Sequence, residues 1–225
     1  MVYLMKSAKM RSRKTEQSEA TRERLVLASM DLFAHRGIHY TSLDEIARRA
    51  RITKGAIYWH FRSKDALVDA IFERIREDWQ RTVLRRLGEG ASPMDKVERL
   101  FANYHELLSQ EPEICLFLQR AMLEPNTKIV RKVNEVFDKT AKSIGAIFEE
   151  GKNAGLFAEE LDSRLLAFSI LSALAGAVTH CHSDKTLQFA GLIDEIKKQT
   201  IARLTPEQAA PGLAASAAGI ARSSR

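Results

Sequence analysis

The amino-terminal fold is decided by residues 41–61, which read TSLDEIARRARITKGAIYWHF. Thr, Ser and Asp favour the position just before a helix. We therefore expect Thr41 to cap one short helix, with Ile46 on its apolar face. We expect Thr53 to cap a second short helix that runs to about Phe61. Two short capped helices joined by a tight turn are typical of a helix-turn-helix.

Helices flank this pair on both sides. Apolar residues recur at helical spacing between Ser18 and Arg36, and Gly37 suits the left-handed conformation that ends a helix. After the pair, Ser63 is expected to cap a long helix that reaches about Leu87. Residues 18–65 are therefore predicted to form a three-helix domain.

The outward face of the second short helix carries groups that suit DNA. Thr53, Lys54 and Gly55 offer a hydroxyl, an ammonium and a closely approachable backbone, which are natural partners of phosphate oxygens. Tyr58 and His60 have polar tips within reach of phosphates. Trp59 can pack on sugar, and Lys54 and Tyr58 can also reach base edges.

The run Tyr58-Trp59-His60-Phe61 also has an ordinary explanation, an aromatic core cluster. We favour the core for Phe61, which has no polar tip. DNA contact is favoured for Tyr58 and His60, and Trp59 is left open between the two.

Charge supports a polyanionic partner at one end of the chain only. Residues 1–65 contain 14 Lys and Arg against 7 Asp and Glu, whereas residues 66–225 contain 21 against 22. The whole positive excess therefore lies in the first part. Residues 1–17 are expected to form a flexible basic arm, either a solubilising tail or an arm lying along DNA.

The remaining residues predict a larger helical domain over 66–204. With only 11 Gly and 5 Pro in 225 residues, long helices are favoured throughout, and the fold class is all-α with about nine helices. Residues 205–225 are rich in Ala, Gly, Pro and Ser and are predicted to be a disordered tail.

One helix lacks charge over the 19 residues from Leu165 to Ser183. Its length suits a membrane span, but its Ser, Thr and His residues favour a helix buried in a soluble assembly. Its small residues suit close packing at a dimer seam with the last helix, against the alternative of an intramolecular core. Three successive residues, His180 to His182, point apart on a helix and predict no metal site.

Residues 41–64 closely resemble the TetR family of bacterial repressors, and TKGAIYWHFRSKDAL (53–67) is most similar to the drug-efflux repressors of the AcrR type. The resemblance is specific over about residues 19–79. It implies some nine helices, a long fourth helix linking two domains, and dimerisation through the last two helices.

The resemblance also implies which residues contact DNA. Adding those favoured by the residue chemistry, the predicted DNA contacts are Thr41, Ser42, Arg51, Thr53, Lys54, Gly55, Tyr58, Trp59, His60 and Lys64. The family usually has glycine where this chain has Arg51. A left-handed Arg51 costs roughly 1 kcal/mol, and we expect its charge to offset that cost by contacting phosphate.

A small lipophilic effector is implied by the resemblance. Its expected contacts are apolar residues with a few polar tips, namely Phe101, Tyr104, His105, Phe117, Met122, Phe137 and Phe148. Both cysteines, Cys115 and Cys181, are expected to be reduced, buried thiols, and we expect neither a metal nor a cofactor.

These features predict a cytoplasmic homodimeric repressor that binds palindromic operator DNA and is released by its effector, with control of an efflux system as the implied target. The alternative is an activator, or a DNA-binding protein without effector control. An enzyme is disfavoured because the chain has no nucleophile elbow, Gly-rich phosphate loop or catalytic His–carboxylate spacing. No secretory signal or membrane attachment is expected.

Overall fold

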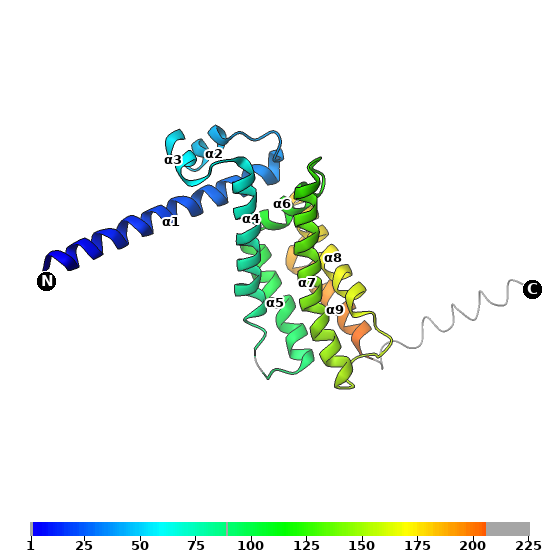
Figure 1. The fold of residues 1–225 in the computed structure, drawn as a ribbon. Helices are drawn as coiled ribbons and strands as arrows, with labels where there is room; N and C mark the ends of the chain where they lie inside the picture. Colours follow the sequence, from blue (N-terminus) through cyan, green and yellow to red (C-terminus); the bar gives the residue numbers. More distant parts are fainter. Residues whose placement is uncertain (1, 89, 206–225) are drawn as a thin grey trace, which may run out of the picture. The chain divides into compact units, whose positions relative to one another are not determined.

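The computed structural model describes residues 2–88 and 90–205, with side chains described from Thr15 onward. The expected carboxy-terminal tail lies outside the described residues, except for Thr205. Nine α-helices and one π-helical segment, η1, occur within the described ranges, and no strand does (Figure 1). The all-α prediction is therefore confirmed.

The chain forms two compact units. Unit 1 comprises residues 1–77 and 116–132, and unit 2 comprises residues 78–115 and 133–225. The division falls inside helices α4, α6 and α7, so these three helices contribute to both units. The predicted boundary at residue 65 separates only the helix-turn-helix from the rest, whereas unit 1 adds most of α4 and the α6–α7 turn.

Unit 1 contains the amino-terminal helices. They are α1 (Val2–Arg36), α2 (Leu43–Arg49), α3 (Lys54–His60) and most of α4 (Lys64–Asp78). Side chains with almost no exposed surface fill its core: Leu25, Phe33, Ile46, Ile57, Leu67, Ile71 and Phe117. Each of the first four helices contributes at least one of them, so the helix-turn-helix shares its core with the helices around it.

Helix α1 is longer than expected. It begins at Val2 rather than near Ser18, so the segment predicted to be a flexible arm belongs to this helix. No glycine or proline interrupts the chain before Gly37, which takes φ 91° and ends the helix as expected.

The cap of α2 differs from the prediction. Ser42, and not Thr41, is the N-cap: its hydroxyl accepts from the Glu45 N–H, and the Glu45 carboxylate accepts from the Ser42 N–H. This reciprocal arrangement satisfies two backbone donors. Thr41 is buried instead, and its hydroxyl donates to the Gly37 carbonyl oxygen. The capping roles of Thr53 and Ser63 are confirmed, because each hydroxyl accepts from the N–H three residues later.

Unit 2 is a bundle of longer helices. Its elements are η1 (Trp79–Leu84), α5 (Pro93–Gln110), the start of α6 (Glu113–Met122), most of α7 (Thr127–Asn153), α8 (Ser163–Ser183) and α9 (Phe189–Leu204). Helix α9 packs on both α5 and α8 (Figure 1). The predicted last helix began at about Thr186, whereas α9 begins at Phe189 after a turn in which Asp184 accepts hydrogen bonds from Thr186.

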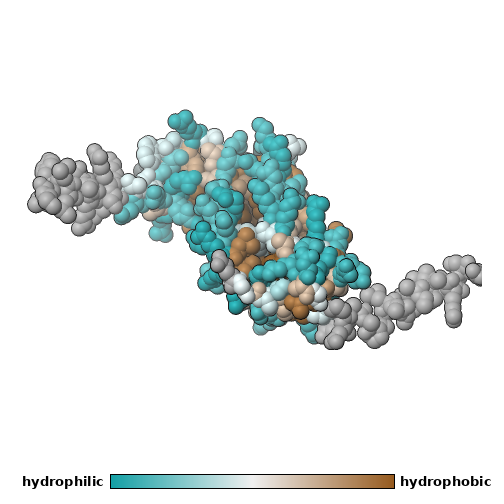
Figure 2. All heavy atoms as spheres, turned by 60° about the horizontal axis from the view of Figure 1, so that its bottom comes forward, coloured by the Kyte–Doolittle hydropathy of each residue, from teal (hydrophilic) through white to brown (hydrophobic). Residues whose placement is uncertain are grey.

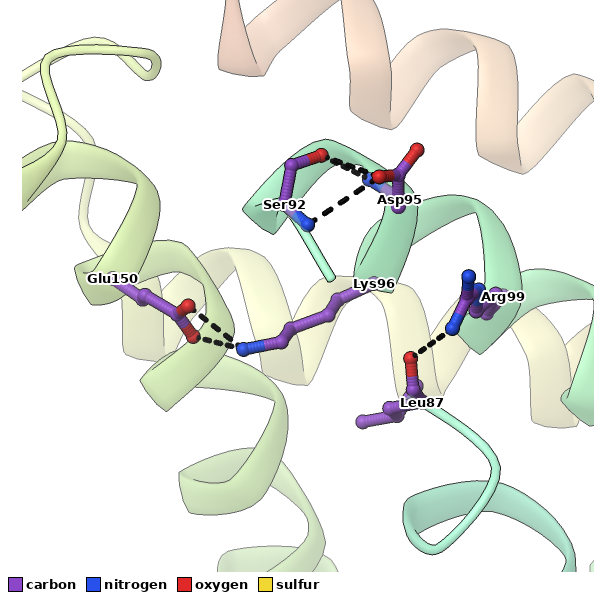
Figure 3. Close-up of polar contacts among 6 residues, drawn as sticks. All are labelled: Leu87, Ser92, Asp95, Lys96, Arg99 and Glu150. Carbon is purple, nitrogen blue, oxygen red and sulfur yellow. Dashed lines mark hydrogen bonds and ion pairs between the residues drawn. The ribbon is translucent and has the colours of Figure 1, made fainter. Parts of the chain in front are cut away.

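The start of α5 is fixed by polar contacts (Figure 3). Ser92 and Asp95 form a second capping box. On the same turn, Lys96 reaches the Glu150 carboxylate of α7 at 2.7 Å, and Arg99 donates to the Leu87 carbonyl oxygen at 2.8 Å. These contacts hold the preceding loop and α7 against α5.

The long fourth helix changes its winding at Trp79. We expected one α-helix to about Leu87, but residues 79–84 form π-helical turns. Asp78, at the junction, is only 2% exposed and pairs with Arg81, and the Asn103 side chain donates to the Val83 carbonyl oxygen at 3.2 Å. Such turns are rare and often occur at functional sites.

Helix α8 is apolar but only partly covered within the chain. It is the one described helix long and apolar enough to pass as a membrane span, with 44% of that window buried. Core helices of soluble proteins pass the same test, so this is weak evidence for a membrane. Large apolar side chains exposed elsewhere form patches on a mostly hydrophilic surface (Figure 2).

Candidate nucleic-acid interface

The turn between α2 and α3 contains a left-handed residue. Arg51 takes φ 54°, the only positive φ among described non-glycine residues, as the missing glycine implied. Arg24 of α1 donates to the Ala50 carbonyl oxygen and, at 3.3 Å, to that of Arg51. The Arg24 guanidinium thus binds two carbonyl oxygens of the turn and helps to offset the backbone strain at Arg51. The Arg51 side chain is exposed.

The two short helices cross over a small apolar core. Ile46 and Ile57 are fully buried, and Ala47 lies between them with 3% exposure. Phe61 is 4% exposed, and the Arg22 guanidinium lies 5.3 Å from its ring centre. The core assignment of Phe61 is therefore confirmed, because its ring packs inward and its face meets a cation from α1.

The opposite face of α3 is exposed. Trp59 and Tyr58 are 73% and 48% exposed, although both are large aromatics. The ring of Trp59 meets that of His60 edge to face at 4.6 Å. Around Gly55, an added Cβ would meet no atom within 4 Å. Trp59, which the sequence left open, is thus on the surface with Tyr58, and none of the described residues covers the backbone at Gly55.

Lys54 is held by an acidic neighbour. Its Nζ lies 2.8 Å from the Asp44 carboxylate of α2. That hydrogen bond and the negative charge raise the pKa of Lys54, so the ammonium stays charged. Both side chains are more than half exposed, and a surface pair of this kind is weak enough to exchange partners.

His60 is kept neutral near pH 7. Burial lowers its pKa, and the positive charge of Arg22 lowers it further. A neutral imidazole donates one hydrogen bond and carries no charge. A phosphate near this ring would favour its protonation.

Three predicted DNA contacts are engaged within the chain. Thr41 is 1% exposed and its hydroxyl donates to the Gly37 carbonyl oxygen. The Ser42 hydroxyl donates to the Glu45 carboxylate, although Ser42 itself is exposed. The Lys64 ammonium donates to three backbone carbonyl oxygens. The structure therefore brings Thr53, Lys54, Gly55, Tyr58 and Trp59 onto one exposed face, and places Thr41 and Lys64 in supporting contacts.

Sequence reasoning missed Tyr40 and Arg24. Tyr40 is 76% exposed in the loop before α2, with its ring edge to face against His39 at 5.2 Å. An aromatic residue in a short polar loop beside two hydroxyl residues was the available signal. Arg24 gave none, because its partners are backbone carbonyls 26 and 27 residues away.

The structure does not gather the effector candidates in one unit. Unit 1 contains Phe117, in a cluster with Phe33 and Phe72, and Met122, which is 43% exposed. The candidates in unit 2 are Phe101, Tyr104, His105, Phe137 and Phe148.

Tyr104 is one of the buried residues of unit 2 with a polar group. It is 6% exposed, and its ring lies 4.7 Å from that of Trp79, which the sequence did not single out. Burial raises its pKa well above the ordinary tyrosine value, so the hydroxyl stays protonated. His105 instead stacks on Phe189 of α9 at 6.0 Å.

Neither cysteine forms a disulfide. Cys115 is buried and Cys181 half-buried. Burial raises the pKa of Cys115 to about 12, which leaves an unreactive thiol. Within the described ranges, no group of three or more His, Cys, Asp or Glu is placed to hold a metal ion.

Two short capped helices over a minimal apolar core, with aromatic and cationic groups exposed on the second, define a helix-turn-helix protein of the DNA-binding class. Comparison with known proteins agrees. Residues 25–71 match the family described as "Bacterial regulatory proteins, tetR family", and residues 72–202 match "YsiA-like protein, C-terminal region". The chain belongs to the TetR family of transcriptional regulators.

Relatives that match most of the chain are less identical to it than relatives that match a shorter part. The fatty acid metabolism regulator protein of Bacillus subtilis is 23% identical over 69% of this chain and 80% of its own length. The transcriptional regulator AcrR of Shigella flexneri is 44% identical, but over 28% of this chain and 29% of its own length. These relatives are regulators and not enzymes.

Solved structures show the same fold. A putative fatty acid metabolism regulator of Clostridium perfringens superimposes with a TM-score of 0.72 at 23% identity, covering 81% of this chain and 98% of that one. A complex of SmeT with triclosan gives 0.69 at 21% identity, covering 86% and 96%. At this identity the likeness concerns the fold alone.

Proposed function

We propose that this protein is a cytoplasmic, dimeric transcriptional repressor that binds palindromic operator DNA and releases it when a small lipophilic effector binds. The observation that carries the DNA part is the exposed face of α3. Trp59 and Tyr58 are exposed there beside the Lys54 ammonium. In an isolated domain, large aromatics would pack inward, so this face suits a partner.

Each residue on this face suits one part of a duplex. Lys54 exchanges Asp44 for a phosphate, and Tyr58 donates its hydroxyl to a phosphate or a base edge. Trp59 packs on sugar, and Thr53 and the open backbone at Gly55 allow close approach. Arg51, exposed in the turn, contacts a neighbouring phosphate. His60 adds a charge once a phosphate favours its protonation.

The uncovered side of α8 supports a dimer. Leu165 is 65% exposed and Ser172 and Ala173 are exposed, on a helix without charge in its middle. An added Cβ at Gly176 would meet no atom within 4 Å, so the helix has room there for the same helix of a second copy. A dimer places two α3 helices on two half-sites of the DNA. A single helix-turn-helix binds DNA weakly, so the second copy is needed for a high operator affinity.

The effector part concerns unit 2. Tyr104 offers a protonated hydroxyl in a unit whose buried side chains are mostly apolar, Phe101 and Phe148 among them. A lipophilic molecule with one polar end suits such an interior. Helices α4, α6 and α7 run through both units and are the elements able to carry a change from unit 2 to the DNA-binding unit.

The class of effector is proposed from the relatives. One relative that matches most of this chain is named as a fatty acid metabolism regulator of Bacillus subtilis. A fatty acid is therefore the first ligand to test. Triclosan, which the SmeT structure contains, is the second. SmeT is named as the repressor of a multidrug efflux pump, so release by triclosan would favour control of an efflux system.

The test begins with selection of duplexes from a random library by the full-length protein. We expect a palindrome whose half-sites lie about 34–36 Å apart, and an affinity that falls steeply as salt rises. Each ligand is then added to the bound complex. Failure to select any duplex, or an affinity independent of salt, would overturn the DNA part. Release by neither ligand, with no thermal shift, would overturn the effector part.

A further inference from the structure

The loop of residues 37–42, between α1 and α2, converges on one cation. Lys64, at the start of α4, donates from Nζ to the carbonyl oxygens of Ile38 at 2.8 Å, His39 at 3.2 Å and Thr41 at 2.9 Å. Three carbonyls within four residues of chain therefore turn toward the same nitrogen.

This arrangement uses the whole donor capacity of the side chain. An ammonium group has three N–H donors and no acceptor, and each donor has one carbonyl partner here. Lys64 is also half-buried. A phosphate oxygen could bind Lys64 only by displacing a loop carbonyl, which would then lose a charge-assisted hydrogen bond.

A carboxylate accepts a hydrogen bond from a backbone N–H of the same loop. Glu124, in the α6–α7 turn, accepts from the Ile38 N–H at 2.9 Å, and Thr41 closes the loop by donating to the Gly37 carbonyl oxygen at 2.9 Å. The Lys64 ammonium therefore binds carbonyl oxygens of the loop, and the Glu124 carboxylate binds one of its amides. The loop conformation thus depends on two side chains that come from outside the helix-turn-helix.

The braced loop ends at groups that face solvent. Tyr40 is 76% exposed, and Ser42 is exposed as the cap of α2. The geometry points to Lys64 as a positioning residue, which holds the loop so that Tyr40 and Ser42 meet operator DNA, and not as a phosphate ligand. This inference rests on the proposed DNA binding, and it revises the role implied for Lys64 by the family resemblance.

The first test compares Lys64→Met with Lys54→Met in the full-length protein, using the selected operator over a series of salt concentrations. A lost phosphate contact lowers the slope of log affinity against log salt by about 0.9, so a dimer that loses one contact in each subunit shows a fall of about 1.8. We expect that fall for Lys54→Met. For Lys64→Met we expect an affinity about tenfold lower at every salt concentration with an unchanged slope.

Lys64→Arg tests whether charge alone is sufficient. The planar guanidinium cannot direct its donors to three converging carbonyls, so we expect it not to restore wild-type affinity. Full restoration would overturn the inference, as would a Lys64→Met slope that falls like that of Lys54→Met, or a Lys64→Met affinity equal to wild type.

Glu124→Ala distinguishes the two explanations by the direction in which operator affinity changes. It removes a negative charge from a DNA-binding unit, so electrostatics alone predict tighter binding. Loss of the loop anchor predicts weaker binding, with the wild-type salt slope and a smaller ratio of operator to non-specific affinity. Tighter binding by Glu124→Ala would overturn the inference. This variant also serves if Lys64→Met does not fold.

Hydrogen exchange of the loop amides gives a readout without DNA. We expect residues 38–42 to exchange faster in Lys64→Met and in Glu124→Ala, with α8 and α9 unchanged. Unchanged exchange in both variants would overturn the inference. If the wild-type protein binds no duplex, both the proposed function and this inference fail. If the wild type binds and the salt slope of Lys64→Met falls, only this inference is overturned.

Discussion

Helices α3 and α8 meet their expected partners in opposite ways. Helix α3 has seven residues and exposes the large aromatics Tyr58 and Trp59 beside a cation. Helix α8 has 21 residues and leaves Leu165, Ser172 and Ala173 exposed. A polyanion demands residue types that stand out in a sequence. A surface that binds a second helix or a lipophilic ligand consists of the same apolar residue types as a protein core, so it cannot be distinguished from a core in the sequence.

The largest expected effect separates core from effector contact. Phe117 is fully buried in unit 1, with ring centres 6.5 Å from Phe33 and 5.5 Å from Phe72. Phe117→Ala should lower the free energy of unfolding by about 3–5 kcal/mol. Urea unfolding measures it, with the exposed Met122→Ala as control, expected within about 0.5 kcal/mol. Lost effector binding with unchanged stability would restore Phe117 as a ligand contact.

The second prediction concerns the uncovered face of α8. Gly176→Arg places a large cation where an added Cβ meets no atom of the structurally described residues within 4 Å, and it removes a glycine from a helix. We expect a folded monomer whose operator affinity falls by roughly 100-fold, because the two half-sites no longer act together. Sedimentation and DNA titration check this. Ala146→Arg, exposed on α7, should stay dimeric; a dimeric Gly176→Arg would move the seam elsewhere.

A third change should alter stability and function in opposite directions. Gly55→Ala adds a methyl group that meets no atom of the described residues within 4 Å, and should stabilise the free protein by up to about 1 kcal/mol. The same methyl group should lower operator affinity by about tenfold, or roughly 1.4 kcal/mol, by blocking close approach. Thermal unfolding and DNA titration measure the two. Gly191→Ala in α9, equally open, should leave affinity unchanged.

A fourth change should strengthen binding. Asp44→Asn removes the partner of Lys54 and should raise operator affinity by up to about fivefold, since an exposed pair of this kind is worth at most about 1 kcal/mol. In the double variant with Lys54→Met the gain should vanish. A gain that persists would mean that Asp44 repels the duplex directly.

The smallest expected effect is a pH dependence at His60. Its pKa is lowered in the folded protein, so its contribution to stability is present above the unfolded pKa of about 6.5 and lost as pH falls through the folded pKa. Operator affinity should change in the opposite sense and rise as pH falls, because phosphate favours the imidazolium. His60→Gln should flatten both dependences; an unaltered binding profile would remove His60 from the interface.

Much of the helix-turn-helix was predictable because its signals are local. Caps at Thr53 and Ser63, the break at Gly37 and the buried Phe61 follow from residues within a few positions. The misplaced cap at Thr41 shows the limit of such signals. Two adjacent hydroxyl residues each have an acidic residue three positions later, Asp44 after Thr41 and Glu45 after Ser42, and only the folded chain shows that Ser42 and Glu45 form the capping box.

The effector site was the least predictable part. Aromatic residues at helical spacing mark a core in any helical domain, so Phe117 and Phe148 looked alike in the sequence. The division of α4, α6 and α7 between two units separated them. The π-helical turns at Trp79 were equally hidden, because they depend on packing against α5.

The sequence by itself determined the helical class, the position of the helix-turn-helix and the concentration of positive charge in its first 65 residues, since these depend on local residue types. Tertiary structure decided which cations are exposed and which are internal. Lys54 and Lys64 are both lysines near the start of a helix, but one meets an exposed carboxylate and the other three carbonyl oxygens from a distant loop. Only the folded chain brings those oxygens together.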